Sequence, residues 1–292
     1  MMEWPAAPNL TLTHLQQANR VLVSCGASIS EINSVRRAFS AVKGGKLASR
    51  APNCDQVTLI VSDVPTGQEY NVASGPTLQS PANAPEALDV ITRYDLRSQL
   101  PAEILQTIET PREFSTKSAS QRSHFVLLSN DHALRAAETS SQKLGFLAET
   151  VKEIADEQIA EGCEGLMNRL RQNQSKGPVC LISGGEFSCR VNGEGIGGRN
   201  LETALRLAML GANSEQEFVA VCAGTDGIDG NSRAAGAAID NTTIERAKAI
   251  GLDANDFLQR SDAFSFFHAL GDAIITGPTG TNVRDLRIVL RG

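Results

Sequence analysis

The sequence lacks any apolar run near the roughly 20 residues that a bilayer-spanning helix needs. Residues 1–8 have neither the basic nor the apolar region of a signal peptide. There is no Cys-x-x-Cys pair either, because the 6 cysteines are dispersed and lie far from the 4 histidines. This pattern argues against a zinc ribbon or a redox motif. We therefore expect a cytoplasmic protein with reduced, structural thiols and no membrane partner.

Two common nucleotide-binding motifs are also missing. No Gly-x-x-x-x-Gly-Lys-Ser/Thr sequence occurs, and residues 193–198 match Gly-x-Gly-x-x-Gly only loosely, after an expected hairpin arm at 187–193. Neither a Walker-type ATPase nor an orthodox dinucleotide fold is supported. With 27 basic and 33 acidic residues, the net charge of -6 offers no overall attraction to nucleic acid.

The composition is that of a folded protein, with 41% hydrophobic and 21% charged residues, and 292 residues suit two domains. Apolar periodicity predicts helices over 15–22 and 32–42, and a β-branched run predicts a strand at 57–61. A polar stretch at 111–122 is the expected linker between the domains.

From His124 onward, strand and helix patterns alternate, which favours parallel βαβ units. The expected fold is α/β, with two domains of Rossmann-like parallel sheets at 1–118 and 119–292. In such sheets, loops that follow strands gather at one edge, where ligands bind. We expect the glycine-rich loops to line a cleft between the domains.

Four loops in the last 110 residues carry the glycines suited to anion binding. Glycine tolerates positive φ and has no Cβ to block the approach of an anion to backbone N–H groups. Each loop could also be an ordinary turn. The candidate cofactor-binding residues in these loops are Ser183, Gly184, Gly185, Glu186, Gly197, Gly198, Asn200, Thr225, Gly277, Thr279, Gly280, Thr281 and Asn282.

Arg199 is the leading candidate for anion binding. It stands at the start of an expected apolar helix, so that a guanidinium and a helix N-terminus would point at one place. The alternative is a surface arginine in a cap or an exposed ion pair.

Asp226 and Asp229 lie three residues apart in a glycine-rich loop after an expected strand. Two hard oxygen ligands could hold a phosphate-bound Mg²⁺, which takes only one or two carboxylates. The alternative is a turn in which both aspartates cap backbone N–H groups.

Lys43 and Lys46 flank Gly44-Gly45 at an expected helix end. They could close over a phosphate or a carboxylate, or they could only complement the helix macrodipole.

Motifs along nearly the whole chain resemble the glycerate 2-kinases of the MOFRL family, whose members are also named tartrate-utilisation kinases and hydroxypyruvate reductases. The matching motifs are EINSVR at 31–36, KGGKLA at 43–48, SDVP at 62–65, ASGPT at 73–77, SGGE at 183–186, GGRN at 197–200, AGTDGIDG at 223–230 and TGPTGTNV at 276–283. They stand in family order.

The resemblance implies ATP- and Mg²⁺-dependent phosphorylation of the 2-hydroxyl of D-glycerate, giving 2-phosphoglycerate. It assigns anion clamping to Arg199 and the two lysines, and a metal or hydroxyl-activating role to Asp226 and Asp229. Asp63, Ser74 and Thr77 are the expected substrate-binding residues. A homodimer is compatible with this reading. The alternatives are a remnant that binds nucleotide or hydroxy acid without turnover, and an NAD(P)-dependent hydroxypyruvate reductase.

The chain departs from the family pattern in three places. Leu201 stands where the family usually has Gln, and Asp131 where it usually has Arg. The family's amino-terminal Gly-Lys-Ala segment, with a lysine proposed to be catalytic, and its Ser-Gly-Gly-Gly-Ser loop have no counterpart here. The resemblance therefore implies a truncated family member with an incomplete first domain and exposed sheet edges.

Overall fold

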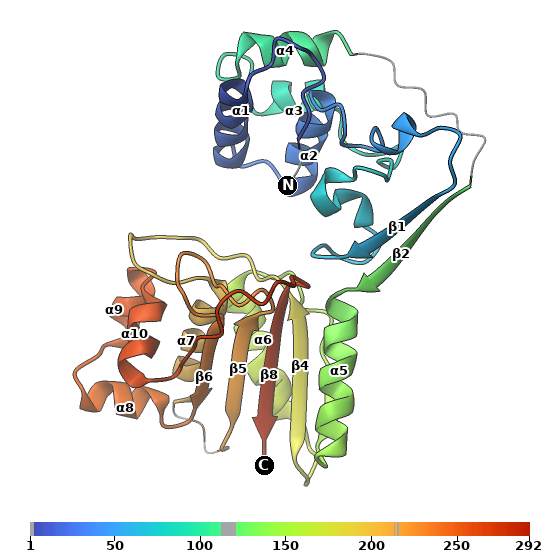
Figure 1. The fold of residues 1–292 in the computed structure, drawn as a ribbon. Coiled ribbons are helices and arrows are strands. Elements are labelled where there is room, and N and C mark those ends of the chain that lie inside the picture. The colour runs from blue at the N-terminus through green and yellow to red at the C-terminus, as the bar shows by residue number, and fades with distance from the viewer. Residues whose placement is uncertain (1–2, 112–120, 213, 215) are drawn as a thin grey trace. The chain divides into compact units, whose positions relative to one another are not determined.

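The computed structural model describes residues 3–111, 121–212, 214 and 216–292 (Figure 1). The chain forms two compact units. The first comprises Met1–Ile60 and Thr66–Val126, and the second comprises Val61–Pro65 and Leu127–Gly292. Most of the expected linker falls at 112–120, outside the described residues.

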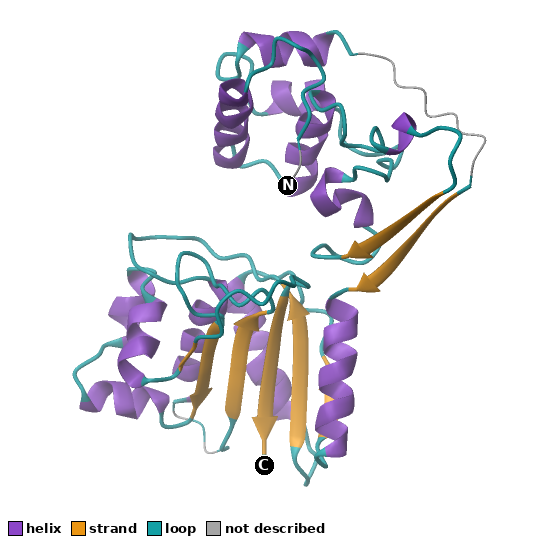
Figure 2. Ribbon diagram, in the orientation of Figure 1, coloured by secondary structure: helices purple, strands orange, loops and turns teal. Residues whose placement is uncertain are grey.

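The first unit is mainly helical (Figure 2). Its helices are α1 (Leu12–Ser24), α2 (Ile29–Ala38), α3 (Ala87–Arg93) and α4 (Ala102–Glu109), with 3-10 turns at Ala48–Arg50 and Glu69–Ser74. Capping boxes at Thr11 and Ser28 start α1 and α2. The prediction that the second helix continues to residue 42 is wrong, because α2 ends at Ala38 and the chain then turns into the 43–46 loop.

The strands β1 (Gln56–Val61) and β2 (Arg122–Leu128) pair in a two-stranded sheet. Apolar side chains on these strands are exposed, among them Val57, Leu59 and Phe125. A two-stranded sheet has little capacity to bury such side chains by itself.

The second unit is built on a six-stranded sheet in the order β3-β4-β8-β5-β6-β7. The strands are β3 (Leu147–Thr150), β4 (Val179–Gly185), β5 (Val219–Gly224), β6 (Gly236–Asp240), β7 (Ala273–Ile274) and β8 (Asp285–Arg291). The α/β class is confirmed, but the expectation of a parallel sheet is wrong. Within this sheet only β3 and β4 pair in parallel. The last strand, β8, inserts antiparallel between β4 and β5, and β6 is antiparallel to both β5 and β7.

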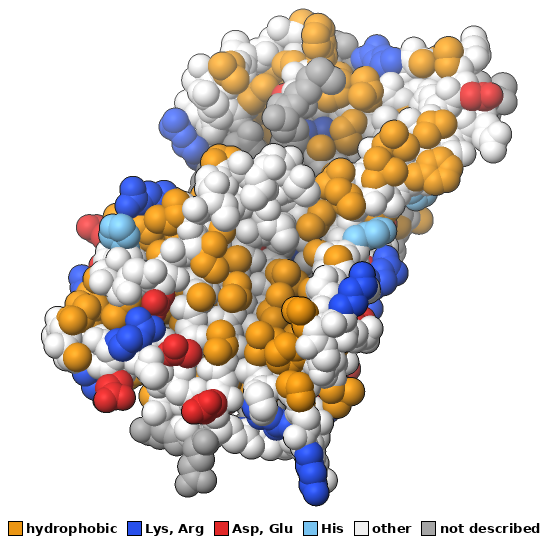
Figure 3. Space-filling model, turned by 60° about the horizontal axis from the view of Figure 1, so that its bottom comes forward, with side chains coloured by type: hydrophobic (Ala, Val, Ile, Leu, Met, Phe, Trp, Pro, Cys, Tyr) orange, Lys and Arg blue, Asp and Glu red, His pale blue; other side chains and the backbone are white. Residues whose placement is uncertain are grey.

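Helices cover the two faces of this sheet unequally. The helix α5 (Asn130–Lys143) packs on one face, against Cys180 and Ile182. The opposite face holds the main core, beneath the remaining helices. These are α6 (Ile159–Gln172), α7 (Arg199–Gly211), α8 (Thr243–Ala249), α9 (Ala254–Gln259) and α10 (Ala263–Leu270). Figure 3 shows hydrophobic side chains in view on the side where α5 leaves the sheet partly open, and Leu286, Ile288 and Leu290 are only half-buried.

Candidate functional site

The mixed sheet still brings three loops to one edge. Since β8 is antiparallel to its neighbours, its first residue, Asp285, pairs with the last residue of β4 and the last residue of β5, Gly185 and Gly224. The chain therefore leaves β4, leaves β5 and enters β8 at the same place. The N-terminus of α7 contributes to the same edge, and a cavity lies there.

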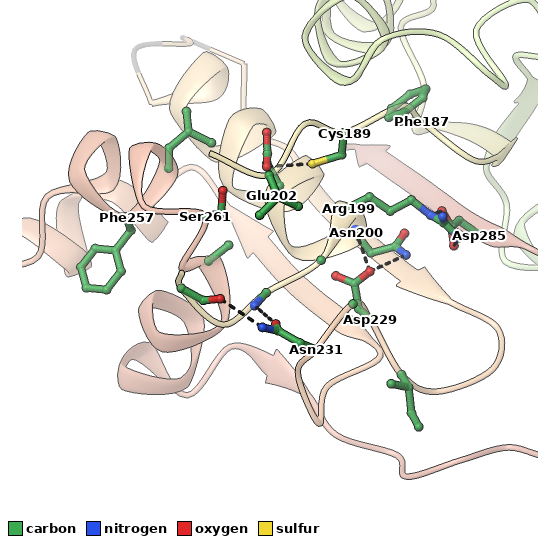
Figure 4. A pocket seen from close by; sticks show the side chains of 18 of the residues that line it. Phe187, Cys189, Arg199, Asn200, Glu202, Asp229, Asn231, Phe257, Ser261 and Asp285 are labelled. Carbon is green, nitrogen blue, oxygen red and sulfur yellow. Dashed lines mark hydrogen bonds and ion pairs between the residues drawn. The ribbon is translucent and has the colours of Figure 1, made fainter. Parts of the chain in front are cut away.

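The cavity has a volume of about 580 Å³ and belongs entirely to the second unit (Figure 4). Its polar and charged lining consists of Cys189, Arg199, Asn200, Glu202, Asp226, Asp229, Asn231, Ser261, Asn282 and Asp285. Its apolar and glycine lining consists of Phe187, Val191, Gly195, Gly197, Gly198, Ile228, Gly230, Phe257, Leu258 and Ala263. Seven of the sequence-derived candidates thus meet in one cavity.

Arg199 reaches the cavity already paired with two carboxylates. Its Nε donates to Asp285 Oδ2 at 2.6 Å, and its terminal nitrogen lies 2.8 Å from Glu186 Oε1. Burial lowers the pKa of Arg199, but the hydrogen bond and charge of Asp285, with Glu186, outweigh burial and raise it. Burial likewise raises the pKa of Glu186, against the opposing charge of Arg199. The guanidinium is therefore held in place before any ligand arrives.

Asp229 caps α7 from the neighbouring loop. Its two carboxylate oxygens accept from the backbone N–H groups of Asn200 at 3.1 Å and Leu201 at 2.8 Å. The close approach requires glycine at 198, where a Cβ would lie 2.5 Å from the carboxylate carbon. Burial raises the pKa of Asp229 to about 6, although these hydrogen bonds oppose the rise. The N-terminus of α7 thus already holds an anion from its own chain.

Asp226 takes a different position in the same loop. Its Oδ1 accepts from the backbone N–H of Ile228 at 3.1 Å, and its carbonyl accepts from Thr279 N–H at 2.9 Å. Together with Asp229 it lines the cavity. Within the described residues, no group of three His, Cys, Asp or Glu side chains could by itself hold a metal ion.

The 276–283 loop binds to the 224–230 loop through Thr225. Thr225 Oγ1 donates to the carbonyl of Arg284 at 2.7 Å and accepts from Val283 N–H at 2.9 Å, and Thr279 Oγ1 donates to the carbonyl of Thr225 at 2.6 Å. From this loop only Asn282 lines the cavity. The half-buried Gly277 and the exposed Thr279, Gly280 and Thr281 lie outside the lining.

The 183–186 segment is largely part of the sheet. Ser183, Gly184 and Gly185 belong to β4, which is buried along its whole length. The backbone N–H of Gly185 donates to Asn130 Oδ1 at 2.9 Å, and that of Glu186 to Asp156 Oδ1 at 3.2 Å. Among these four residues, the structure brings only the Glu186 carboxylate to Arg199.

The remaining candidates are divided between the units. Lys43, Lys46, Ser74 and Thr77 belong to the first unit, and the exposed Asp63 to the second. Lys46 Nζ donates to the carbonyls of Arg37 at 2.6 Å and Ser40 at 2.7 Å, and burial lowers the pKa of Lys46 to about 8.

Lys43 is buried and pairs with Glu3. Ser74 Oγ donates to Asn33 Oδ1 at 2.9 Å, and Thr77 Oγ1 accepts from Thr58 Oγ1 at 2.9 Å. The 43–46 loop is fastened to the 74–76 loop by backbone bonds such as Gly45 N–H to the carbonyl of Gly75, at 2.7 Å. In the first unit these side chains therefore make local contacts.

Sequence reasoning missed three parts of the cavity: Asp285, the Cys189–Glu202 pair and the wall at Phe257 and Leu258. The alternation of Leu286, Ile288 and Leu290 correctly predicts a half-buried strand. By the same alternation, Asp285 and the side chains between these three residues lie on the other face of the strand. In the structure that face is buried. The expected hairpin arm at 187–193 is wrong, because this segment is a loop that forms one wall of the cavity.

The fold and the cavity define the class of this protein: an α/β protein of two units, with a mixed sheet that gathers glycine-rich loops around an arginine–carboxylate cluster. Two family models match the chain. The MOFRL family covers residues 179–285, and a domain of unknown function, DUF4147, covers residues 1–109.

Relatives extend the match over nearly the whole chain. A D-glycerate 2-kinase of Thermotoga maritima is 35% identical, over 96% of this chain and 67% of the relative. A glycerate 2-kinase of Pyrococcus horikoshii is 30% identical, over 96% of this chain and 66% of the relative. The crystal structure of a glycerate kinase from Thermotoga maritima matches with a TM-score of 0.83 and 32% identity, covering 100% of this chain and 70% of that chain.

The chain therefore belongs to the glycerate kinase family that combines DUF4147 with MOFRL. It spans about two thirds of the length of the relatives named above. The resemblance drawn from the sequence motifs is confirmed. In the described residues, no helix is long and apolar enough to cross a membrane.

Proposed function

We propose that the chain transfers the terminal phosphoryl group of ATP to the 2-hydroxyl of D-glycerate, giving 2-phosphoglycerate and ADP. Family membership supports a phosphotransferase that acts on a small hydroxy acid. The observation that carries the proposal within this chain is that the Arg199 guanidinium, fixed by Asp285, and Asp226 line the same cavity. Phosphoryl transfer depends chiefly on positioning and on neutralising charge, and this pair can serve both.

Arg199 is the proposed electrostatic stabiliser. Asp285 and Glu186 hold the guanidinium on two sides, so that it needs no reorganisation when charge develops on the transferring phosphoryl group. An incoming phosphate oxygen would compete with Glu186, the more exposed of its two partners.

Asp226 is the proposed contact for Mg²⁺ or for the substrate hydroxyl. A magnesium ion bound mainly by nucleotide phosphates needs only one or two protein carboxylates. The donor set fits that requirement, because Asp226 uses one oxygen for a turn hydrogen bond, whereas Asp229 uses both oxygens to cap α7. When bound, Mg²⁺ would neutralise the nucleotide phosphates.

We also propose that Lys43 and Lys46 act as anion clamps, with Asp63, Ser74 and Thr77 contributing to substrate binding. The lowered pKa of Lys46, about 8, shows how strongly burial disfavours its charge. A nearby anion would raise that pKa again, so this lysine is the better candidate of the two.

The reductase alternative has little support. A dinucleotide fingerprint joins a strand directly to a helix. Here residues 193–198 follow an irregular loop that begins after β4 ends at Gly185. The free cysteines support the cytoplasm, where thiols stay reduced, as the site of the reaction.

A coupled assay of ADP release tests the proposal. With ATP, Mg²⁺ and D-glycerate, we expect turnover that falls by about 100-fold or more in both Arg199→Ala and Asp226→Asn. The matched control, Arg169→Ala, removes an arginine whose side chain is 57% exposed and lies outside the cavity lining. Unchanged turnover in the two site variants would refute the assigned roles.

A further inference from the structure

The cavity has two chemically different ends. Arg199, Asp285, Asp226 and Asp229 form an ionised end, whereas Phe257, Leu258, Val191 and Ala263 form an apolar end. Figure 4 shows Phe257 on the opposite side of the cavity from the Arg199–Asp285 pair. A ligand that fills the cavity must therefore offer an apolar surface at one end and polar groups at the other.

The lining is unsuited to a chain of phosphates. Among its described residues the lining carries four carboxylates, those of Glu202, Asp226, Asp229 and Asp285, and one guanidinium, and Glu202 is paired with Arg206 outside the lining. That guanidinium already donates to Asp285 and pairs with Glu186. Two N–H groups at the start of α7, those of Asn200 and Leu201, already donate to Asp229. A chain of phosphates enclosed in the cavity would therefore have to displace several of these carboxylates and would be repelled by the others, whereas a phosphate at the Arg199 end has to compete only with Glu186.

A three-carbon hydroxy acid fits no better. It carries a carboxylate of its own, and it would leave most of a 580 Å³ cavity unfilled. The volume is instead typical of pockets that enclose a larger organic ligand, which span about 300–1,000 Å³.

The apolar end is rigid enough to recognise a flat ring. The Arg260 guanidinium lies 4.6 Å from the centre of the Phe257 ring, and the Phe257 and Phe266 rings form a T-shaped pair with a centroid distance of 5.6 Å. These contacts fix the orientation of the ring. A preorganised aromatic side chain loses little entropy when a planar ligand packs against the wall that it forms.

We propose that this cavity binds the nucleoside part of the phosphoryl donor, with a purine base against Phe257 and Leu258. The sugar hydroxyls donate to carboxylates of the lining, and the phosphates leave the cavity at the end where Arg199 and Asp226 lie. This inference rests on the proposed kinase function. It places the uncharged part of the nucleotide, and not its phosphates, inside the cavity.

Adenosine, which carries no phosphate, is the direct probe. Calorimetric titration of the full chain should detect adenosine binding whose dissociation constant is nearly unchanged between low and high salt, because no charge is involved. Leu258→Ala should weaken adenosine binding by about tenfold, since apolar contact with the base is lost. Ile250→Ala, which truncates an exposed side chain outside the lining, is the matched control and should leave binding unchanged.

Photolabelling of the unaltered chain gives a second test that does not depend on the folding of a variant. Azidoadenosine should label residues 187–203 or 254–263, and excess ATP should protect them. If ATP with Mg²⁺ binds but adenosine neither binds nor labels these segments, the inference fails while the kinase function stands. If neither ATP nor adenosine binds and D-glycerate is not phosphorylated, both the proposed nucleoside site and the proposed kinase function fail. If Leu258→Ala weakens the binding of D-glycerate and not the binding of adenosine, the cavity is the site of the hydroxy acid and the inference is overturned.

Discussion

At the scale of single residues, buried carboxylates organise the cavity. Asp285 is almost fully buried and holds the Nε of Arg199, while Asp229 caps α7. The sequence predicted Arg199 and Asp229 as candidates, but not that each already has a partner within its own chain. A local pattern cannot show a partner that lies 86 residues away, as Asp285 does from Arg199.

Asp285→Asn should destabilise the protein and displace the Arg199 side chain from its position. Loss of the buried charge leaves the guanidinium with only Glu186, so we expect about 1–3 kcal/mol of lost stability. Urea denaturation measures the change in the free energy of unfolding. Asp256→Asn, which removes an exposed partner of Arg260, should cost about 0–1 kcal/mol and serves as the control. Equal effects of the two substitutions would contradict the structural importance of the Arg199–Asp285 pair.

Asp229 should give the protein a characteristic pH dependence. Burial raises its folded-state pKa to about 6, above the ordinary value of 3.8, so the folded state retains a proton that the unfolded state has lost. The contribution of Asp229 to stability should therefore fall as pH rises from about 4 to 6, by roughly 3 kcal/mol in total.

The comparison with Asp229→Asn isolates this effect. The difference in the free energy of unfolding between the native protein and the variant should decline across that pH window and stay flat above pH 7. A difference that is constant, or that grows with pH, would contradict the assigned pKa shift.

At the scale of elements, sequence periodicity identified most helices and strands but not their pairing. The alternation after His124 was correctly interpreted as α/β, because apolar spacing depends on local geometry. The direction of β8 could not be inferred in that way. Leu286, Ile288 and Leu290 show which residues share a face, and that pattern is identical for parallel and antiparallel neighbours.

The junction between Asp229 and α7 should be intolerant of a side chain at position 198. Gly198→Ala would place its Cβ 2.5 Å from the carboxylate carbon of Asp229, so we expect a loss of about 1–3 kcal/mol from the displaced cap. Thermal unfolding checks this prediction. Gly177→Ala, whose Cβ would meet only a serine oxygen at 4.0 Å, should be nearly neutral. A neutral Gly198→Ala would show that the cap can adjust.

At the scale of the whole molecule, the two units differ in how many of the predicted site residues they bring together. The second unit forms the cavity by itself, with seven of the predicted residues in its lining. In the first unit, Lys43, Lys46, Ser74 and Thr77 make local contacts with their own unit. These contacts do not reveal the proposed binding roles, which only a bound ligand can test.

The exposed apolar strands of the first unit should promote self-association. The paired substitution Val57→Thr and Leu59→Thr should reduce light scattering in concentrated solution without loss of folded stability, since both side chains are more than half exposed. Leu144→Thr, at an exposed position after α5, is the control. If the control suppresses scattering as strongly as the paired substitution, the strands are not the cause.

We propose that this chain phosphorylates the 2-hydroxyl of D-glycerate, and the position of the new phosphate on the product distinguishes this reaction from phosphorylation of the 3-hydroxyl. Enolase accepts 2-phosphoglycerate but not its 3-phospho isomer, so an enolase-coupled assay without phosphoglycerate mutase reports the position. Phosphoenolpyruvate should form immediately when ATP, Mg²⁺ and D-glycerate are added. No product, or product only after the mutase is added, would contradict this proposal.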